Sequence, residues 1–108
     1  MDIKESDWKV FRKLHKIALE RFCERLLKEV RRTIDGKGSQ HERYLKLSAL
    51  LHRRTKAMAA AFNGARRSRA TILLSNIIDE GLLTDKELDE FSAELRQQIE
   101  TIRSIRRS

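Results

Sequence analysis

Residues 7–34 read DWKVFRKLHKIALERFCERLLKEVRRTI, and this stretch decides the fold class. Its apolar residues recur every three or four positions, the spacing that places side chains on one face of an α-helix: Trp8, Phe11, Leu14, Ala18, Phe22, Leu26 and Val30. Further apolar residues beside this stripe widen it, which predicts burial against two neighbouring elements. We expect a helix over about 7–34, with Ser6 as its N-cap and the glycines after Asp35 as its end.

Two later helix starts carry a capping-box pattern, in which a Ser or Thr is followed three residues later by a Glu. Ser39 with Glu42 predicts a helix over about 40–63, and Thr84 with Glu87 predicts another over about 85–104. Between them, the apolar stripe shifts by roughly 100° around the helix near Gly64. A break there realigns both parts with one core, so we expect a separate helix over about 66–80.

The composition agrees with this series of helices. The chain has 108 residues, no proline and only four glycines, so few loops are expected. With 40% hydrophobic and 37% charged residues, it is too apolar for a disordered chain and too charged for a membrane-embedded one. We expect an all-α fold with a single domain over residues 1–108. Because short loops make successive helices antiparallel neighbours, the predicted architecture is an antiparallel helical bundle of four helices, or of three if the second and third are continuous.

Location and assembly leave fewer signals in the sequence. No apolar stretch approaches the roughly 20 residues that a membrane-spanning helix needs, so no transmembrane segment is expected. The first seven residues carry acids and no apolar stretch, unlike a secretory signal. With Cys23 as the single cysteine, no internal disulfide can form, and a reducing, cytoplasmic location is expected. The helix over 7–34 is long, and its spare apolar surface is a candidate seam for a homodimer.

The sequence lacks motifs for catalysis, cofactors and metals. His41 and Glu42 begin like a helical zinc signature, but Leu45 stands where the second histidine belongs. No glycine-rich phosphate loop occurs, and Cys23 lies mid-helix beside the apolar stripe, where a thiol packs as a small hydrophobic group. We therefore expect no catalytic, cofactor-binding or metal-binding residues, and a protein that is not an enzyme.

The basic residues are distributed unevenly, within a net charge of +8. Residues 43–78 contain eight Lys and Arg and no acid, so i,i+4 pairing within a helix cannot neutralise them. On one continuous helix, Lys46, Arg53, Lys56 and Arg67 would share a face, and such a stripe suits contact with a phosphate backbone. The predicted polyanion-binding residues are Arg53, Arg54, Lys56, Arg66, Arg67 and Arg69, with Lys9, Arg12, Lys13 and Lys16 as a second patch.

An acidic block follows the basic stretch, because residues 79–94 hold seven acids and one base. Two functions from different classes agree with this polarity. The first is a non-enzymatic basic protein that binds a polyanion, RNA or DNA, through backbone phosphates. The alternative is a protein-interaction subunit or adaptor, either a homodimer that pairs its basic and acidic faces or a binder of an acidic protein. The two functions can be distinguished by whether the acidic block covers Arg66, Arg67 and Arg69 within the fold.

Overall fold

A computed structural model of the chain describes residues 3–107 and contains helices, with no strand in that range. The expected all-α class is therefore confirmed. The elements are α1 (Glu5–Ile34), α2 (Gln40–Phe62), the short 3-10 helix η1 (Arg67–Arg69), α3 (Ala70–Asp79), α4 (Asp85–Leu88) and α5 (Ala93–Arg107).

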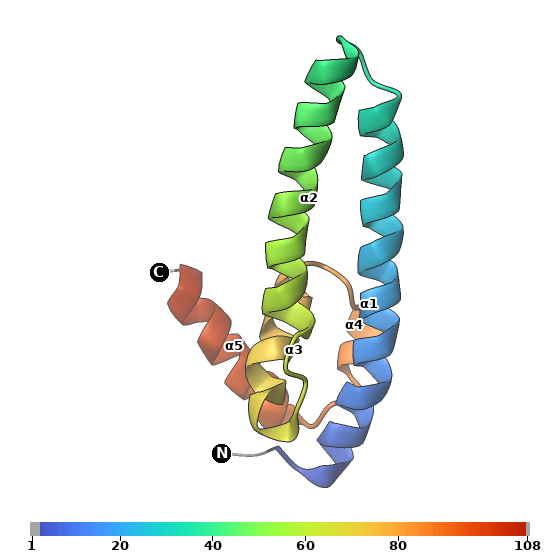
Figure 1. Ribbon diagram of the computed structural model, residues 1–108. Helices are drawn as coiled ribbons and strands as arrows, with labels where there is room; N and C mark the ends of the chain where they lie inside the picture. Colours follow the sequence, from blue (N-terminus) through green and yellow to red (C-terminus); the bar gives the residue numbers. More distant parts are fainter. Residues whose placement is uncertain (1–2, 108) are drawn as a thin grey trace.

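Helices α1 and α2 form a long antiparallel hairpin that dominates the shape of the molecule (Figure 1). Partway along it, the Arg54 guanidinium of α2 lies 3.0 Å from the Glu29 carboxylate of α1. At its base, the rings of Phe22 and Phe62 meet edge to face with centroids 5.8 Å apart. The radius of gyration is 16.4 Å, well above the roughly 13 Å of a compact domain of about 100 residues. The molecule is therefore elongated along the hairpin, with extents of 52 × 30 × 24 Å.

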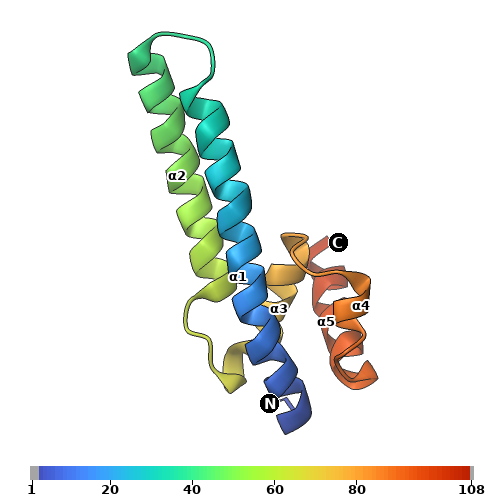
Figure 2. The ribbon, with the colours of Figure 1, turned by 90° about the vertical axis from the view of Figure 1, so that its right-hand side faces the viewer.

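The hydrophobic core lies at the base of the hairpin, where α3 contacts α1, α2 and α5 (Figure 2). Helix α3 is the most apolar element, and Leu73, Leu74 and Ile77 are all buried in the centre of this core. Leu95 and Ile99 of α5 close it from the outside. The apolar stripe of α1 supplies the opposite wall, from Phe11 to Phe22, as its helical spacing predicts.

The outer half of the hairpin has only two helices. We call this part the arm, and it comprises residues 23–34 of α1 and 40–57 of α2. Among the described residues of the arm, only Leu50 is buried. Helices α3, α4 and α5 all lie toward the base (Figure 1). The helices therefore pack together as a bundle at the base, and the arm extends from it.

The break predicted near Gly64 is confirmed. Helix α2 ends at Phe62, and Gly64 has a φ of +68°, a conformation that glycine adopts without the strain of a side chain. The following helix was expected from residue 66, but the chain first makes the 3-10 turn η1 and becomes α-helical at Ala70.

The expected single helix over 85–104 is wrong, because α4 ends at Leu88 and α5 begins at Ala93. The chain turns at Ser92, whose backbone N–H donates to the Asp7 carboxylate at 2.8 Å and whose hydroxyl donates to it at 2.6 Å. The same hydroxyl accepts from the N–H of Leu95 at 3.2 Å and so caps the start of α5. A contact between residues 85 positions apart in the chain thus sets the start of α5.

The other helix starts differ in how well their caps were predicted. Thr84 and Glu87 form the complete capping box, with hydrogen bonds of 3.1 and 2.9 Å. At α2, the Ser39 hydroxyl accepts from the N–H of Glu42 at 3.1 Å, the serine half of the box. The prediction of Ser6 as an N-cap is wrong, because α1 already begins at Glu5. Ile3, two residues before this start, packs into the core and holds the chain that leads into α1 against it.

Asp7 is only 3% exposed, so loss of its carboxylate leaves the Ser92 N–H without an acceptor. We expect Asp7→Ala to lower the free energy of unfolding by about 2–3 kcal/mol. Thermal denaturation followed by circular dichroism should show a melting temperature lower by roughly 10 °C. Asp85→Ala removes an exposed carboxylate that has no ion-pair partner in residues 3–107, and it should change the stability by at most about 0.5 kcal/mol. Equal losses in the two variants would contradict the role of Asp7.

Candidate functional site

Five of the seven acids in the block at residues 79–94 form ion pairs within the fold, with Lys4 and with bases of α1 and α5. Burial disfavours the charge on Asp79, but hydrogen bonds from Arg103 and Arg106, at 2.7 and 2.9 Å, outweigh it and lower the pKa of Asp79. The other pairs are Lys4–Glu94 at 3.1 Å, Arg21–Glu87 at 2.7 Å, Arg96–Asp89 at 3.5 Å, and Lys13–Glu90. In the described chain, none of these acids pairs with a base between residues 43 and 69. The acidic block therefore does not cover the basic stretch.

The strongest of these pairs ties α4 to α1. Arg21 donates two hydrogen bonds to the Glu87 carboxylate, at 2.7 and 2.9 Å, and a third to the carbonyl of Leu82 at 2.8 Å. The bonds from Arg21 and from the backbone N–H of Thr84 stabilise the carboxylate and lower the pKa of Glu87 to about 2, from an ordinary value of 4.5. The same contact raises the pKa of Arg21.

Three of the predicted polyanion-binding residues are engaged in ion pairs. Arg54 lies 3.0 Å from Glu29, and Arg67 lies 2.9 Å from Glu5 at the start of α1. Lys13 pairs with an acid of the acidic block. Each of these bases would have to leave an internal partner before it contacted an external phosphate, so they are weaker candidates than unpaired bases.

The remaining predicted residues have no acidic partner within residues 3–107, and the structure places them in separate regions. They are Arg53 and Lys56 on α2, Arg66 and Arg69 around η1, and Lys9, Arg12 and Lys16 on α1, and all are exposed. The second patch lies on another side of the molecule from the α2 bases. Lys16, for example, is about 160° around α1 from Arg32, which lines a groove together with α2 bases.

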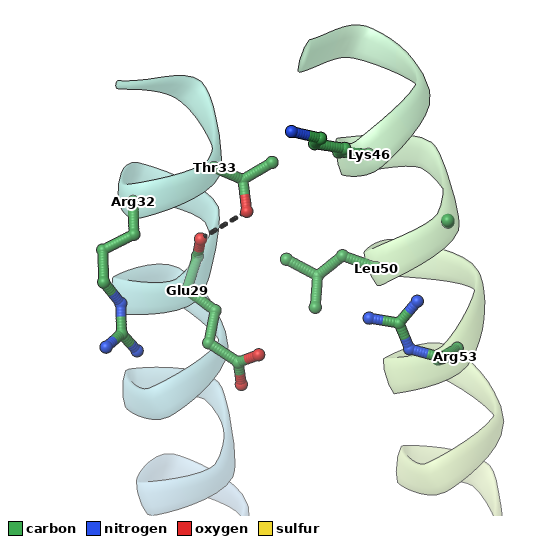
Figure 3. Close-up of a pocket in the computed structure, with 7 residues that line it drawn as sticks. Glu29, Arg32, Thr33, Lys46, Leu50 and Arg53 are labelled. Carbon is green, nitrogen blue, oxygen red and sulfur yellow. Dashed lines mark hydrogen bonds between the residues drawn. The ribbon is translucent and has the colours of Figure 1, made fainter. Parts of the chain in front are cut away.

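A groove of about 380 Å³ runs between α1 and α2 on one side of the arm (Figure 3). Leu50 points between the two helices and forms its floor, with Lys46 about one turn before it on α2 and Arg53 about one turn after it. Arg32 of α1 borders the groove, with its guanidinium on the side of α1 away from α2 (Figure 3), and the rest of the lining is Glu29, Thr33 and Ala49.

The groove carries a positive balance of charge. Its one acid, Glu29, is already bound by Arg54, and the Thr33 hydroxyl donates to the Glu29 carbonyl at 2.8 Å. Lys46 and Arg53 have no acidic partner among the described residues, and the same is true of Arg32. An anion that enters the groove can therefore contact bases that are not held in internal ion pairs.

Sequence reasoning found part of this groove. Arg53 belongs to the predicted site, and Lys46 lies on the predicted basic stripe, although it was not among the predicted contact residues. Arg32 was missed, since only the pairing of α1 with α2 makes it part of the same groove lining. Nothing in the spacing of Arg32 within its own helix distinguishes it from the neighbouring Arg31.

Other chemistry has less support in the described chain. Within residues 3–107, no three His, Cys, Asp or Glu side chains gather in a way that would hold a metal ion. No helix in that range is both long and apolar enough to cross a membrane. Cys23 is half-buried on α1. The ring of His15 packs between Phe11 and Phe62, with centroid distances of 5.3 and 5.2 Å, which is a structural role.

The low pKa of Glu87 makes its ion pair sensitive to acid. Ionised Glu87 stabilises the fold above its ordinary pKa of 4.5, and this contribution is lost as the pH falls toward the folded value of about 2. We expect Glu87→Gln to be less stable than the wild type at neutral pH and to lose less further stability in this acid window. Urea denaturation from neutral pH to about pH 2 measures both effects. Asp85→Asn should keep the wild-type profile, and a Glu87→Gln profile parallel to the wild type would contradict the assignment.

Comparisons with protein-family models, with curated proteins and with solved structures found no match to this chain.

Proposed function

We propose that this protein binds a polyanion, RNA or DNA, through the basic groove of the arm, and that it is not an enzyme. The proposal rests on one observation, which is that the acids and the groove bases differ in whether they form internal ion pairs. Five of the seven acids of the acidic block pair with Lys4 or with bases of α1 and α5, whereas the groove bases have no acidic partner in the described chain. A solvated helix surface ordinarily mixes the two signs, so a one-sided set of unpaired bases favours a polyanionic ligand. The proposed location is the cytoplasm, where the Cys23 thiol stays reduced.

The groove suits contact with phosphates rather than the reading of bases. Arg32 and Arg53 supply planar guanidinium groups that can bind two phosphate oxygens at once, and Lys46 supplies a mobile point charge. The groove lining contains no aromatic side chain on which a base could stack. Binding would therefore come from charge neutralisation, with a steep dependence on salt and little preference for sequence.

Unpaired bases extend this surface beyond the groove. Lys56 follows Arg53 along α2, and Arg66 and Arg69 lie past the end of that helix. The second patch lies on a different side of α1, so a straight phosphate backbone in the groove does not pass over it. We therefore assign the groove and its α2 neighbours as the primary surface and the second patch as a secondary one.

The alternative is a protein-interaction subunit. A homodimer that pairs basic with acidic faces has little support, because five of the seven acids in the acidic block are already paired within the chain. An acidic protein partner would use the same groove bases as a nucleic acid, so binding experiments have to separate the two ligands.

The test compares two variants with the same loss of charge. One is Lys46→Ala with Arg53→Ala in the groove, and the other is Lys9→Ala with Arg12→Ala in the second patch. Fluorescence anisotropy with a labelled DNA duplex and a labelled single-stranded RNA would be measured over a series of salt concentrations. We expect the groove variant to bind more weakly than the wild type at each salt concentration, with a salt slope smaller by roughly 2. The patch variant should stay closer to the wild type.

Three outcomes would count against this function. Equal losses in both variants would mean that net charge alone decides binding. An affinity that does not change with salt would contradict contact with phosphates. Polyglutamate that competes more strongly than RNA or DNA would favour an acidic protein as the ligand.

A further inference from the structure

The side of the arm that faces away from the groove carries several exposed apolar side chains. Leu27 and Ile34 of α1 are 53% and 50% exposed, and Tyr44 of α2 is 64% exposed. Leu51, also on α2, is exposed as well, seven residues and about two turns beyond Tyr44. Ile34, Tyr44 and Leu47 line one shallow pocket at the tip of the arm, which places the apolar stripes of the two helices on the same side.

Two helices alone cannot bury this side. Within the arm, each helix has one helical neighbour, and Leu50 alone among the described arm residues is buried. Each large apolar side chain that a partner buried would contribute on the order of 1 kcal/mol or more. Several large exposed apolar side chains on one side of the molecule mark an interaction site.

The charges along the edge of this surface indicate what covers it. Six charged residues of α1 and its C-cap lie within about 120° of one another around the helix axis, beside Leu27. Their signs run plus, minus, minus, plus, plus, minus, in the order Lys16, Glu20, Glu24, Lys28, Arg31 and Asp35. Reading this series backwards inverts every sign. An antiparallel copy of the same helix therefore sets each charge opposite one of the other sign.

The three pairs in this series share one centre. Lys16 with Asp35 and Glu20 with Arg31 are both centred between positions 25 and 26, and Glu24 with Lys28 is centred on position 26. The first two pairs are available, because all four residues are exposed and none has an ion-pair partner in residues 3–107. Glu24 and Lys28 already pair within the helix at 3.2 Å.

We infer that the apolar side of the arm is a homodimer interface, in which α1 of one copy packs antiparallel on α1 of the other. The two-fold axis passes near Leu26. Leu27 of both copies lies near the centre, Ile34 lies toward the two ends of the contact, and Glu20 of each copy faces Arg31 of the other. Each surface meets an identical one, as a two-fold interface requires.

The size of the surface sets the expected strength. From Lys16 to Ile34, α1 is about 27 Å long, and two helices side by side are about 20 Å wide. The pair of copies would bury on the order of 1,000 Å², the lower end of specific interfaces. We therefore expect a dimer that dissociates on dilution. The groove bases stay on the outer sides, so this interface does not depend on the proposed polyanion binding.

Charge reversal tests the alignment. Glu20→Arg or Arg31→Glu alone would place like charges opposite each other twice per dimer. We expect each single variant to weaken dimerisation by roughly tenfold at low salt, and the double variant to return to within about threefold of the wild type. Sedimentation equilibrium over a range of protein concentrations measures these dissociation constants.

The apolar contact has a closely matched control. Leu27 and Leu45 are 53% and 51% exposed, but Leu45 lies on the outer side of α2, about 140° around that helix from Leu50. We expect Leu27→Ser to weaken the dimer by more than tenfold and Leu45→Ser to leave it unchanged. Circular dichroism verifies that both variants keep their helix content, as expected for exposed positions.

The outcomes that would overturn the inference are distinct. A protein that is monomeric at every concentration up to hundreds of micromolar overturns it, as does equal weakening by Leu27→Ser and Leu45→Ser. A double reversal as weak as the single ones overturns the antiparallel alignment. A monomer that floats with anionic phospholipid vesicles through Leu27 assigns the surface to a membrane instead.

The groove variant Lys46→Ala with Arg53→Ala should keep the wild-type dimer, so loss of polyanion binding and loss of dimerisation are read separately.

Discussion

Phe22 of α1 packs edge to face on Phe62 at the end of α2, with ring centroids 5.8 Å apart, and it is the last buried residue of α1. On the base side of this contact, α3 and α5 complete the core. Beyond it, residues 3–107 supply no third helix, because both of those helices are held at the base. Because no third helix packs there, the outer part of the hairpin extends as the arm. One side of the arm carries the basic groove, and the other carries the exposed apolar residues.

The division of charge has the same origin. The acidic block lies at the end of α3, in α4 and at the start of α5, all of which pack at the base. Its acids therefore meet bases from the first part of α1 and from α5, such as Arg21 and Arg103. Ion pairs act over a few ångströms, so bases farther out on the arm stay outside their reach. The unpaired charge in the groove is thus a consequence of where the short helices dock.

The groove and the apolar side belong to the same two helices. Helical periodicity separates them, since Lys46 and Arg53 lie well around α2 from Tyr44 and Leu51. The two proposals are therefore compatible, because a dimer formed through one side presents a groove on each outer side. The arm would act as a shared scaffold for both contacts.

The sequence by itself determined the helices, the break near Gly64 and the caps at Ser39 and Thr84, because periodicity, φ preference and capping act over a few residues. It also revealed most of the unpaired bases as candidates. Only the tertiary structure decided the interruption before α5, whose cause is an aspartate 85 residues away. It alone placed Arg32 of α1 and Lys46 of α2 along one groove and selected which bases the acids neutralise. These outcomes depend on which helices pack together, and contacts between residues so distant in the chain leave no local pattern.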